Sequence, residues 1–366
     1  MTPSVRIGIV GTSWWTDMMF APALQSHPQA ELAAICGRNQ GRAAEMAAKY
    51  SIPQVYDDYR EMMAHGGLDA VIVATPDDLH HEITLHALGA GLHVLCEKPL
   101  ALTAQQAWEM YEKAEAAKVK HMVLFTWRWM PFFQYARDLV DQGFIGRCFH
   151  CEFHFLGGDA RSPEYQWHFD QDRALGTLGN LGSHVIDLAR WMLGDIVKVN
   201  AELGVSVVRR GAEGGPIDPA NDSAQLLVEF ASGAHGLIQA SAVAHVADRV
   251  FQQHIRLYGE AGSLEITFYP FGTEAGATIR AARSSETTFQ TLVVPDSYWV
   301  DASRADLFGI FTTQAVGSRL FVEAILENRP VTPSFYDGYK AQQVVDAALE
   351  SHRSGRAVTI VNRPPG

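Results

Sequence analysis

Short apolar runs alternate with alanine-rich helical segments along the first third of the chain, and this alternation restricts the fold more than any other feature of the sequence. The apolar runs are Val5–Val10, Leu32–Cys36, Ala70–Ala74, His93–Cys96 and Met122–Phe125, with a weaker run near Val55. The helical segments between them include Arg42–Tyr50, Leu79–Ala90 and Ala104–Ala117. Apolar strands separated by helices are typical of a parallel sheet that is covered on both faces. We therefore predict a doubly wound α/β domain that binds its ligand beyond the carboxyl ends of the strands.

The pattern changes after about Trp127, where long alternating segments follow one another with few helices between them. The strand-like segments are Cys148–Phe155, Val197–Val208, Ala224–Phe230, Ala234–Ala242, His254–Tyr258 and Ser263–Phe268, and the helical stretches Leu307–Asn328 and Tyr336–Ser354 close the chain. This alternation predicts an α+β domain with a large, mainly antiparallel sheet that is open on one face. Since 366 residues exceed what one hydrophobic core usually supports, we expect two domains, over 1–125 and 126–366. Whether the C-terminal helix packs back on the first domain stays open.

The charge and composition of the chain restrict its partners. Hydrophobic residues make up 47% and charged residues 19%, as in an ordinary globular enzyme. The formal net charge of −12 argues against nucleic acid or a membrane surface as the main partner, because both require a basic face. No apolar run reaches the length of a membrane span, and no basic stub precedes an apolar segment at the N-terminus. We therefore expect a cytoplasmic protein.

Two of the four cysteines, Cys148 and Cys151, form a C-x-x-C pair within a predicted strand. Side chains three residues apart on a strand point to opposite faces, so we interpret both as ordinary thiols and predict no metal site. Cys148, His150, Glu152 and His154 do share one face. We favour a polar sheet face there, exposed or at a subunit contact, over a metal centre.

The first predicted strand runs into the turn GTSWWT, residues 11–16, which keeps one glycine of the phosphate-binding pattern G-x-G-x-x-G. Gly11 retains the tight bend, Ser13 is small and carries a hydroxyl for a phosphate, and Thr16 replaces the glycine that lets helix and strand pack closely. Amides at the start of the following helix still favour an anion. The turn alone leaves nucleotide binding and a plain strand–turn–helix equally open. The residues that would contact the nucleotide are Gly11, Thr12, Ser13 and Trp14.

The end of the second predicted strand bears on the choice between NAD and NADP. NAD sites usually place an acidic residue here for the ribose 2′-hydroxyl, whereas an arginine suits a 2′-phosphate. This chain has Gly37, Arg38 and Asn39. We therefore expect Arg38 and Asn39 to contact the cofactor and NADP to be preferred. NAD stays open, because an arginine can also stack on adenine or lie in solvent.

Two longer motifs resemble those of the glucose–fructose oxidoreductase/inositol dehydrogenase/rhizopine-catabolism (Gfo/Idh/MocA) family. The first is VIVATPDDLHHEI, residues 71–83, followed by GLHVLCEKPLALT, residues 91–103. The second is GTLGNLGSHVIDLARWMLG, residues 176–194. The likeness extends over nearly the whole chain and includes FTWRWMPFFQYARDLVDQGFIG, residues 125–146, and LYGEAGSLEI, residues 257–266. A Glu-Lys-Pro sequence after a fifth strand is specific in this context.

The resemblance implies a dinucleotide-binding Rossmann domain over 1–125 and a substrate-binding and oligomerisation α+β domain over 126–366. It implies an NAD(P)-dependent oxidoreductase that acts on a sugar or cyclitol hydroxyl or carbonyl. It also implies roles for individual residues. The matched residues are Thr75, Pro76, Leu79 and His80 for the loop beside the nicotinamide, Glu97 for a ribose contact, Lys98 for the catalytic lysine, and Asn180 and His184 for the family's Asp and His.

The chemistry of carbinol oxidation explains why these residue types are needed. A hydride leaves for the nicotinamide and a proton leaves for a base, and histidine suits the proton because it titrates near neutrality. The ammonium of Lys98 would stabilise the developing alkoxide. Asn180 and His184 lie one helical turn apart, so both can face one cleft. Because an amide accepts no proton, we expect His184 to work more alone and its pKa to lack one acidic neighbour; Asp187 is left without a role.

Four residues are candidates for contacts with the substrate, and two other functions remain open. Trp127, Arg128, Trp167 and His168 are candidates for sugar contacts, and Arg128 is also a candidate for the cofactor. A non-catalytic dinucleotide sensor and a glycoside-cleaving enzyme with tightly bound NAD remain alternatives. The open face of the second sheet predicts a homodimer or homotetramer.

Overall fold

The computed structural model describes residues 3–361, and the chain divides into two compact units. Unit 1 contains Met1–Phe125 and Val300–Tyr339, and unit 2 contains Thr126–Trp299 and Lys340–Gly366. The chain therefore leaves unit 1 after the first 125 residues and returns to it before the C-terminal helix.

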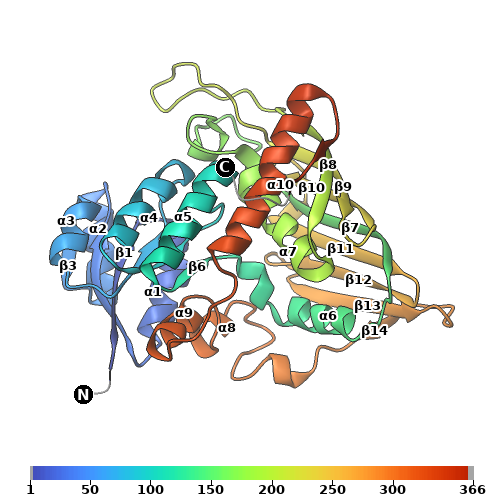
Figure 1. The fold of residues 1–366 in the computed structure, drawn as a ribbon, viewed down its shortest axis with the longest axis horizontal. Helices are drawn as coiled ribbons and strands as arrows, with labels where there is room; N and C mark the ends of the chain where they lie inside the picture. Colours follow the sequence, from blue (N-terminus) through green and yellow to red (C-terminus); the bar gives the residue numbers. More distant parts are fainter. Residues whose placement is uncertain (1–2, 362–366) are drawn as a thin grey trace. The chain divides into compact units, whose positions relative to one another are not determined.

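Unit 1 is built on a parallel sheet with the strand order β3-β2-β1-β4-β5-β6. Its strands belong to the part of the chain drawn in blue to teal in Figure 1. The strands are β1 Val5–Val10, β2 Ala30–Cys36, β3 Gln54–Tyr56, β4 Ala70–Val73, β5 His93–Cys96 and β6 His121–Val123. Their central side chains, such as Ile9, Ile72 and Leu95, are fully buried. The strand order reverses between β1 and β4, which is the place where doubly wound sheets bind their ligands. The predicted doubly wound sheet is confirmed.

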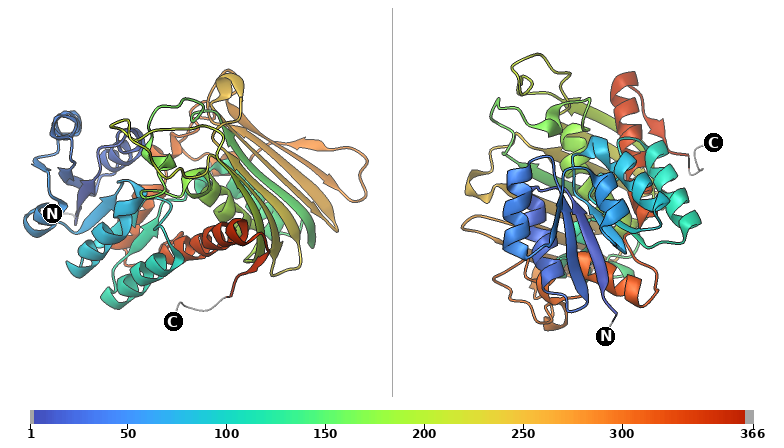
Figure 2. Two further views of the ribbon diagram at one scale, coloured as in Figure 1. Left: turned by 90° about the horizontal axis from the view of Figure 1, so that it is seen from above. Right: turned by 90° about the vertical axis from the view of Figure 1, so that its left-hand side faces the viewer.

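The helices of unit 1 lie on both faces of this sheet (Figure 2, right). They are α1 Ala21–Gln25, α2 Gln40–Tyr50, α3 Tyr59–His65, α4 His80–Gly89, α5 Ala104–Ala117, α8 Ile310–Thr313, α9 Gly317–Leu326 and the first turn of α10 Phe335–Ser354. The side chains of Asn39, Asp58 and Thr103 accept hydrogen bonds from the first turns of α2, α3 and α5. Such N-caps satisfy amides that have no partner within the helix, and they fix where each helix begins.

The prediction of one helix over Leu307–Asn328 is wrong, because the structure breaks it into α8 and α9. Gly317 begins α9 with a φ of +54°, and a Cβ atom there would lie 3.0 Å from the ring of Phe311. Only glycine fits this tight, left-handed position. The apolar periodicity continues across the break, so a pattern based on hydrophobicity does not detect it.

Unit 2 contains a nine-stranded sheet in the order β14-β13-β12-β11-β7-β10-β9-β8-β15. The strands are β7 Cys148–Gly157, β8 Ile196–Gly204, β9 Ser223–Phe230, β10 His235–Ser241, β11 Phe251–Gly259, β12 Gly262–Tyr269, β13 Gly276–Arg283, β14 Gln290–Leu292 and β15 Val358–Thr359. Strands β7 and β10 pair in parallel, and the other neighbours pair antiparallel. The predicted, mainly antiparallel sheet is confirmed, although β8 ends four residues before the predicted Val208.

The two faces of this sheet differ. Phe153, Phe155 and Ile255 belong to the buried face, against which α6 Pro131–Asp141 and α7 Ser183–Leu193 lie (Figure 2, left). Within residues 3–361, no helix covers the other face, where the side chain of Leu227 is 62% exposed. One face therefore forms the core of unit 2 and the other remains open.

The cysteines of the described chain are free thiols. Burial raises the pKa of Cys148 to about 11, and it raises the pKa of Cys151 further. Among residues 3–361, no cluster of three or more His, Cys, Asp or Glu side chains is placed to hold a metal ion. The helices of the same residues include none with both the length and the apolar character needed to cross a bilayer.

Candidate functional site

The turn after β1 requires glycine at its first position. Gly11 has a φ of +119°, and a Cβ atom there would lie 2.2 Å from the carbonyl oxygen of Ala74 at the end of β4. Its amide donates to the carbonyl of Cys36 at the end of β2. The ends of three neighbouring strands therefore meet at Gly11, which gives the close approach of backbone that a dinucleotide site needs.

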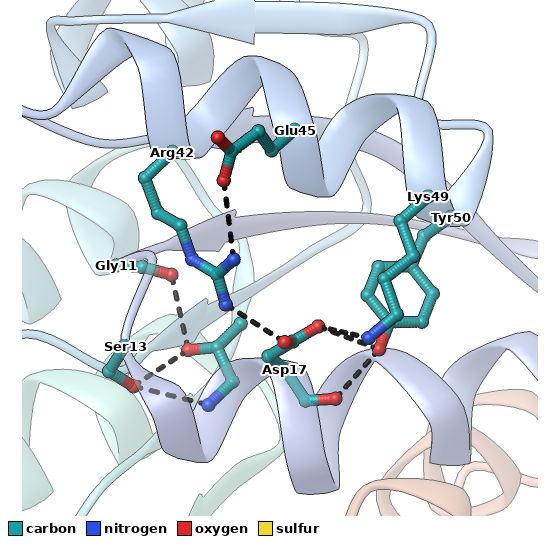
Figure 3. Close-up of polar contacts among 8 residues, drawn as sticks. Gly11, Ser13, Asp17, Arg42, Glu45, Lys49 and Tyr50 are labelled. Atoms are coloured by element: carbon teal, nitrogen blue, oxygen red, sulfur yellow. Dashed lines mark hydrogen bonds and ion pairs between the residues drawn. The ribbon is translucent and has the colours of Figure 1, made fainter.

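Ser13 and Thr16 stabilise the same turn through hydrogen bonds within it (Figure 3). The Ser13 Oγ accepts a hydrogen bond from the Thr16 amide and lies 3.1 Å from the Thr16 Oγ1, which donates to the carbonyl of Gly11. Thr16 is fully buried and begins a π-helical turn, Thr16–Phe20, that precedes α1. The threonine in place of a third glycine thus ties the turn together through its hydroxyl.

A cluster of charged residues fixes the first helical turn to α2, and sequence reasoning missed it. The carboxylate of Asp17 accepts hydrogen bonds from Arg42, Lys49 and Tyr50 (Figure 3). The bond from Lys49 is the largest of the effects that lower the pKa of Asp17 to about 2. Arg42 and Lys49 lie two turns apart on one face of α2, but that spacing does not identify their partner.

Gly37, Arg38 and Asn39, which follow β2, differ in their contacts and exposure. A Cβ atom at Gly37 would lie 2.5 Å from the side chain of Thr12, so glycine makes room for the first turn. The Asn39 Oδ1 accepts from the Arg42 amide and caps α2. Arg38 is exposed at the carboxyl end of β2, with its side chain open to solvent. Arg38 and Asn39 are the two residues predicted to contact the cofactor here, and Asn39 is also the N-cap of α2.

His80 joins the loop after β4 to the loop after β5. Its Nδ1 lies 2.8 Å from the carbonyl oxygen of Pro99 and its Nε2 lies 2.9 Å from the carbonyl oxygen of Thr75. Burial lowers the pKa of His80, against the opposing effect of these two bonds. The imidazole thus lies within hydrogen-bonding distance of one carbonyl oxygen in each of the two predicted cofactor loops, and Pro76 and Leu79 lie between Thr75 and His80 in the chain.

Glu97 and Lys98 directly follow β5 at the carboxyl edge of the sheet. The carboxylate of Glu97 accepts from the Lys98 amide at 3.1 Å, and burial raises its pKa to about 7, against the opposing effects of the charge of Lys98, its amide and the nearby Trp15. Burial also lowers the pKa of Lys98, while the carboxylates of Glu97 and Asp77 oppose that shift. At this edge the charges of Glu97 and Asp77 raise the pKa of Lys98, and the charge of Lys98 lowers the pKa of Glu97.

The two tryptophans of the first turn differ in exposure. Trp15 is half-buried and lies close enough to Glu97 to lower the pKa of its carboxyl, whereas the side chain of Trp14 is 63% exposed. Their ring centroids lie 5.6 Å apart. The first turn thus lies next to the Glu-Lys-Pro segment, which the sequence alone does not reveal.

The predicted residues of unit 2 gather around His184. The π-helical turn Leu178–Gly182 carries the half-buried Asn180 and leads directly into α7, which carries His184 in its first turn. The imidazole is buried, and its centroid lies 5.5 Å from the Trp127 ring and 6.1 Å from the Phe155 ring. Trp127 therefore forms a wall against the predicted proton acceptor.

Arg128 and Asp187 form a buried pair. The Arg128 Nε lies 2.7 Å from one carboxylate oxygen of Asp187, and one terminal nitrogen lies 2.5 Å from the other oxygen. Both side chains are almost fully buried. The pair joins the 3₁₀ turn Thr126–Trp129 to α7 and gives Asp187 the role that the sequence left open.

The loop with Trp167 and His168 is supported by an arginine that sequence reasoning missed. The two rings stack at 3.7 Å, and Phe169 beside them is buried beneath the guanidinium of Arg209 at 4.1 Å. Arg209 also donates to the carbonyl of Ala160 and lies 3.7 Å from the carboxylate of Asp222. No feature of the sequence around Arg209 predicts this role.

The predicted site residues thus form two groups, one in each unit. Unit 1 brings together the first turn, the end of β2 and the loops after β4 and β5. Unit 2 brings Trp127, Arg128 and His184 together through α7.

Comparison with known proteins assigns the family. The chain matches a family model described as "Oxidoreductase family, NAD-binding Rossmann fold" over residues 5–125 and one described as "GFO/IDH/MocA C-terminal domain" over residues 133–265. Levoglucosan dehydrogenase from Pseudarthrobacter phenanthrenivorans is 30% identical over 343 residues, which are 87% of this chain and 86% of that protein. D-xylose 1-dehydrogenase (NADP(+)) 2 from Haloferax volcanii is 26% identical over 365 residues, which are 97% and 100% of the two chains. A solved structure of levoglucosan dehydrogenase in complex with NADH and levoglucosan has a TM-score of 0.85 and 27% identity, and the match covers 98% of this chain and 99% of that chain. The chain therefore belongs to the Gfo/Idh/MocA family of oxidoreductases with an NAD-binding Rossmann fold.

Proposed function

We propose that this protein is an NAD(P)-dependent dehydrogenase or reductase of a sugar, sugar derivative or cyclitol. The observation that carries this proposal is the partly buried Lys98 at the carboxyl edge of an NAD-binding sheet, with the acidic groups of Glu97 and Asp77 supporting its charge. Relatives over nearly the whole chain are dehydrogenases named for levoglucosan and for D-xylose. Their names support a carbohydrate substrate for this chain.

The first turn fits a dinucleotide. Gly11 lies where any Cβ atom would meet the backbone of Ala74, so the chain bends tightly between β1 and the helical turn that follows, as the turn of a dinucleotide site requires. Ser13 and Thr16 keep this turn in shape without two of the three usual glycines. When bound, the nicotinamide supplies the hydride acceptor for oxidation or the hydride donor for reduction.

Lys98 acts on the oxygen of the reacting carbon, and Glu97 acts on Lys98. The ammonium of Lys98 donates a hydrogen bond to this oxygen and stabilises the negative charge that develops there when the hydroxyl proton leaves. Burial, which lowers the pKa of Lys98, brings the ammonium closer to the point where it can also exchange a proton. The charge of Glu97 opposes this shift.

His184 takes the hydroxyl proton in the oxidative direction and returns it in the reductive direction. The Trp127 ring packs against one side of the imidazole, and His184 is held in the first turn of α7. Asn180 bonds a substrate hydroxyl but accepts no proton, since a carboxamide is neutral at every working pH. We propose that Trp167 and His168 complete the sugar site, since aromatic rings pack against its C–H groups.

The proposed function is tested by turnover and binding. The purified protein is mixed with levoglucosan, D-xylose or myo-inositol and with NAD⁺ or NADP⁺, and the absorbance of reduced nicotinamide is followed. We expect reduction with at least one sugar, and none with the variant His184→Asn. Nucleotide binding without turnover of any sugar would instead favour the non-catalytic sensor. Tightly held NAD with cleavage of a glycoside and no net reduction would favour the glycoside-cleaving alternative.

We propose that NADP is preferred, because Arg38 is exposed at the end of β2 and no acidic side chain occupies positions 37–39. A charge-assisted hydrogen bond contributes about 1.5–3 kcal/mol, so Arg38→Ala should weaken NADP⁺ binding about tenfold or more and change NAD⁺ binding less. Calorimetric titration with both nucleotides measures the two effects. Arg60→Ala, at another exposed arginine of unit 1, serves as the control. Equal losses for the two nucleotides would contradict a 2′-phosphate contact.

We also propose a homodimer or homotetramer that forms through the open face of the nine-stranded sheet. No helix of residues 3–361 covers this face, which contains the exposed Leu227 on β9, so it is free to pack against the same face of a second copy. Light scattering should give a mass of two or four chains. A monomer at micromolar concentration would rule the proposal out.

A further inference from the structure

Gln253 is a polar residue in an otherwise apolar part of the sheet in unit 2. It lies on β11 directly opposite Phe155 of β7 and Phe268 of β12. Its side chain is on the buried face together with Ile255 and Leu257, and the residue is 1% exposed. Neither atom of its side-chain amide has a hydrogen-bond partner within residues 3–361.

The two strand neighbours of Gln253 contact Trp127, whose ring lies against His184. The Trp127 ring lies 5.9 Å from the Phe155 ring and 5.5 Å from the Phe268 ring. The same Trp127 ring lies 5.5 Å from the imidazole of His184. Residues directly opposite each other on neighbouring antiparallel strands have Cβ atoms about 4.5–5.5 Å apart. Gln253 therefore belongs to the same layer of side chains as the predicted proton acceptor.

A buried amide without partners costs free energy that an apolar side chain at the same position would not cost. Leucine or methionine would fill a similar volume between the two phenylalanine rings and would need no hydrogen bonds. A carboxamide offers one acceptor oxygen and two N–H donors, whereas a carbinol hydroxyl both donates and accepts. Aromatic rings pack against the C–H faces of a sugar, so the amide and its neighbours together match a polyhydroxylated ring.

We propose that Gln253 is a substrate-binding residue, whose side-chain amide hydrogen-bonds a hydroxyl of the sugar or cyclitol other than the one that reacts. This inference rests on the proposed function, because it assumes a polyhydroxylated substrate beside His184. It makes Gln253 a determinant of specificity. A substrate without that hydroxyl would leave the amide unpaired and would bind more weakly.

The test compares Gln253→Leu with Gln252→Leu. Gln252 is the preceding residue of the same strand, points to the opposite face and accepts a hydrogen bond from Arg249, so it makes a matched control. Calorimetry measures the affinity of each protein, saturated with NADH or NADPH, for levoglucosan, D-xylose and myo-inositol. Binding to the complex with reduced nucleotide needs no turnover. We expect Gln253→Leu to lower the affinity for the tightest of these sugars at least tenfold, while Gln252→Leu and the nucleotide affinities stay unchanged.

Deoxy analogues of the tightest sugar identify the hydroxyl. In the wild-type protein one analogue should bind at least tenfold more weakly than its parent, and in Gln253→Leu that same analogue should bind as well as the parent. Thermal unfolding should show an unchanged or higher midpoint for Gln253→Leu, since an amide that only holds a buried water would lower it on removal. Gln253→Met, with an unbranched side chain of the same length, replaces the leucine variant if the latter does not fold.

The possible failures are distinguishable. If the wild-type protein binds a sugar and Gln253→Leu or Gln253→Met binds it equally well, the role of Gln253 is wrong and the proposed function stands. A lower unfolding midpoint with unchanged sugar affinity also overturns it and assigns the amide a structural role. If the wild-type protein binds none of the three sugars and reduces no nucleotide with them, the proposed function and this inference fail together.

Discussion

Replacing Lys98 with methionine should lower kcat by about 10²–10⁴-fold and leave nucleotide affinity nearly unchanged. Methionine keeps the length and much of the volume of the lysine side chain but has no charge and no N–H donor. The charge of the ammonium stabilises the developing alkoxide, which has no comparable charge in the bound alcohol, so its removal affects the transition state more than the ground state. Steady-state kinetics with the best sugar of the panel and calorimetric titration with the nucleotide measure the two effects.

The same substitution should not destabilise unit 1. Burial lowers the pKa of Lys98 below that of an unfolded chain, so the charged form is disfavoured by folding at any pH below the folded pKa. This loss of stability is relieved only as the pH rises from the folded towards the unfolded pKa. Glu97, whose pKa is about 7 while the lysine charge is present, would lose that charge as a neighbour and take up a proton more readily. The variant therefore leaves no uncompensated buried charge.

Lys113→Met is a suitable control for Lys98→Met. Lys113 lies on α5 of the same unit and pairs at 2.8 Å with Glu109 on the surface. Exposed ion pairs of this kind contribute about 0–1 kcal/mol, so neither kcat nor stability should change much. Wild-type turnover in Lys98→Met would show that the reacting oxygen meets another group. A large loss of turnover in Lys113→Met would mean that the assay reports a general disturbance of the unit.

The sequence predicted the sheet of unit 1 because its central strands, such as β4, are buried on both faces and are therefore apolar. The edge strand β3 is not buried, but its three residues, Gln54 to Tyr56, coincide with the weak apolar run near Val55. The break between α8 and α9 could not be predicted in this way, since it depends on the backbone of Gly317 and its distance from Phe311. Periodicity records which side chains face the core, but it does not record positive φ angles.

The site could be predicted only where its residues form a continuous motif in the sequence. The Glu-Lys-Pro motif and the helix with His184 could be recognised in this way, although their roles remain predictions. The pair of Arg128 and Asp187 joins residues 59 positions apart, and the surroundings of Gln253 depend on the registers of β11 with β7 and β12. Such contacts require the tertiary structure, because composition and spacing do not specify strand register.

Asp187→Ala should lower the free energy of unfolding by about 3–5 kcal/mol, because it leaves the buried guanidinium of Arg128 without its carboxylate. Urea-induced unfolding, followed by circular dichroism, measures the change. Asp141→Ala is the control, since Asp141 pairs with Arg137 at 2.9 Å near the surface of α6, and we expect a change within about 1 kcal/mol. A loss for Asp187→Ala no larger than that of the control would contradict the proposed energetic role of the pair.

The double variant Arg128→Met/Asp187→Leu separates the cost of an unpaired charge from the contribution of the pair. Replacing a buried ion pair with apolar residues of similar volume is often neutral or stabilising, so the double variant should be more stable than Asp187→Ala. Its turnover should nevertheless fall, because Trp127 precedes Arg128 in the chain and lies against His184. Recovered stability with reduced turnover would mean that the pair positions Trp127 as well as stabilising α7. Wild-type turnover in the double variant would mean that the pair contributes only to stability.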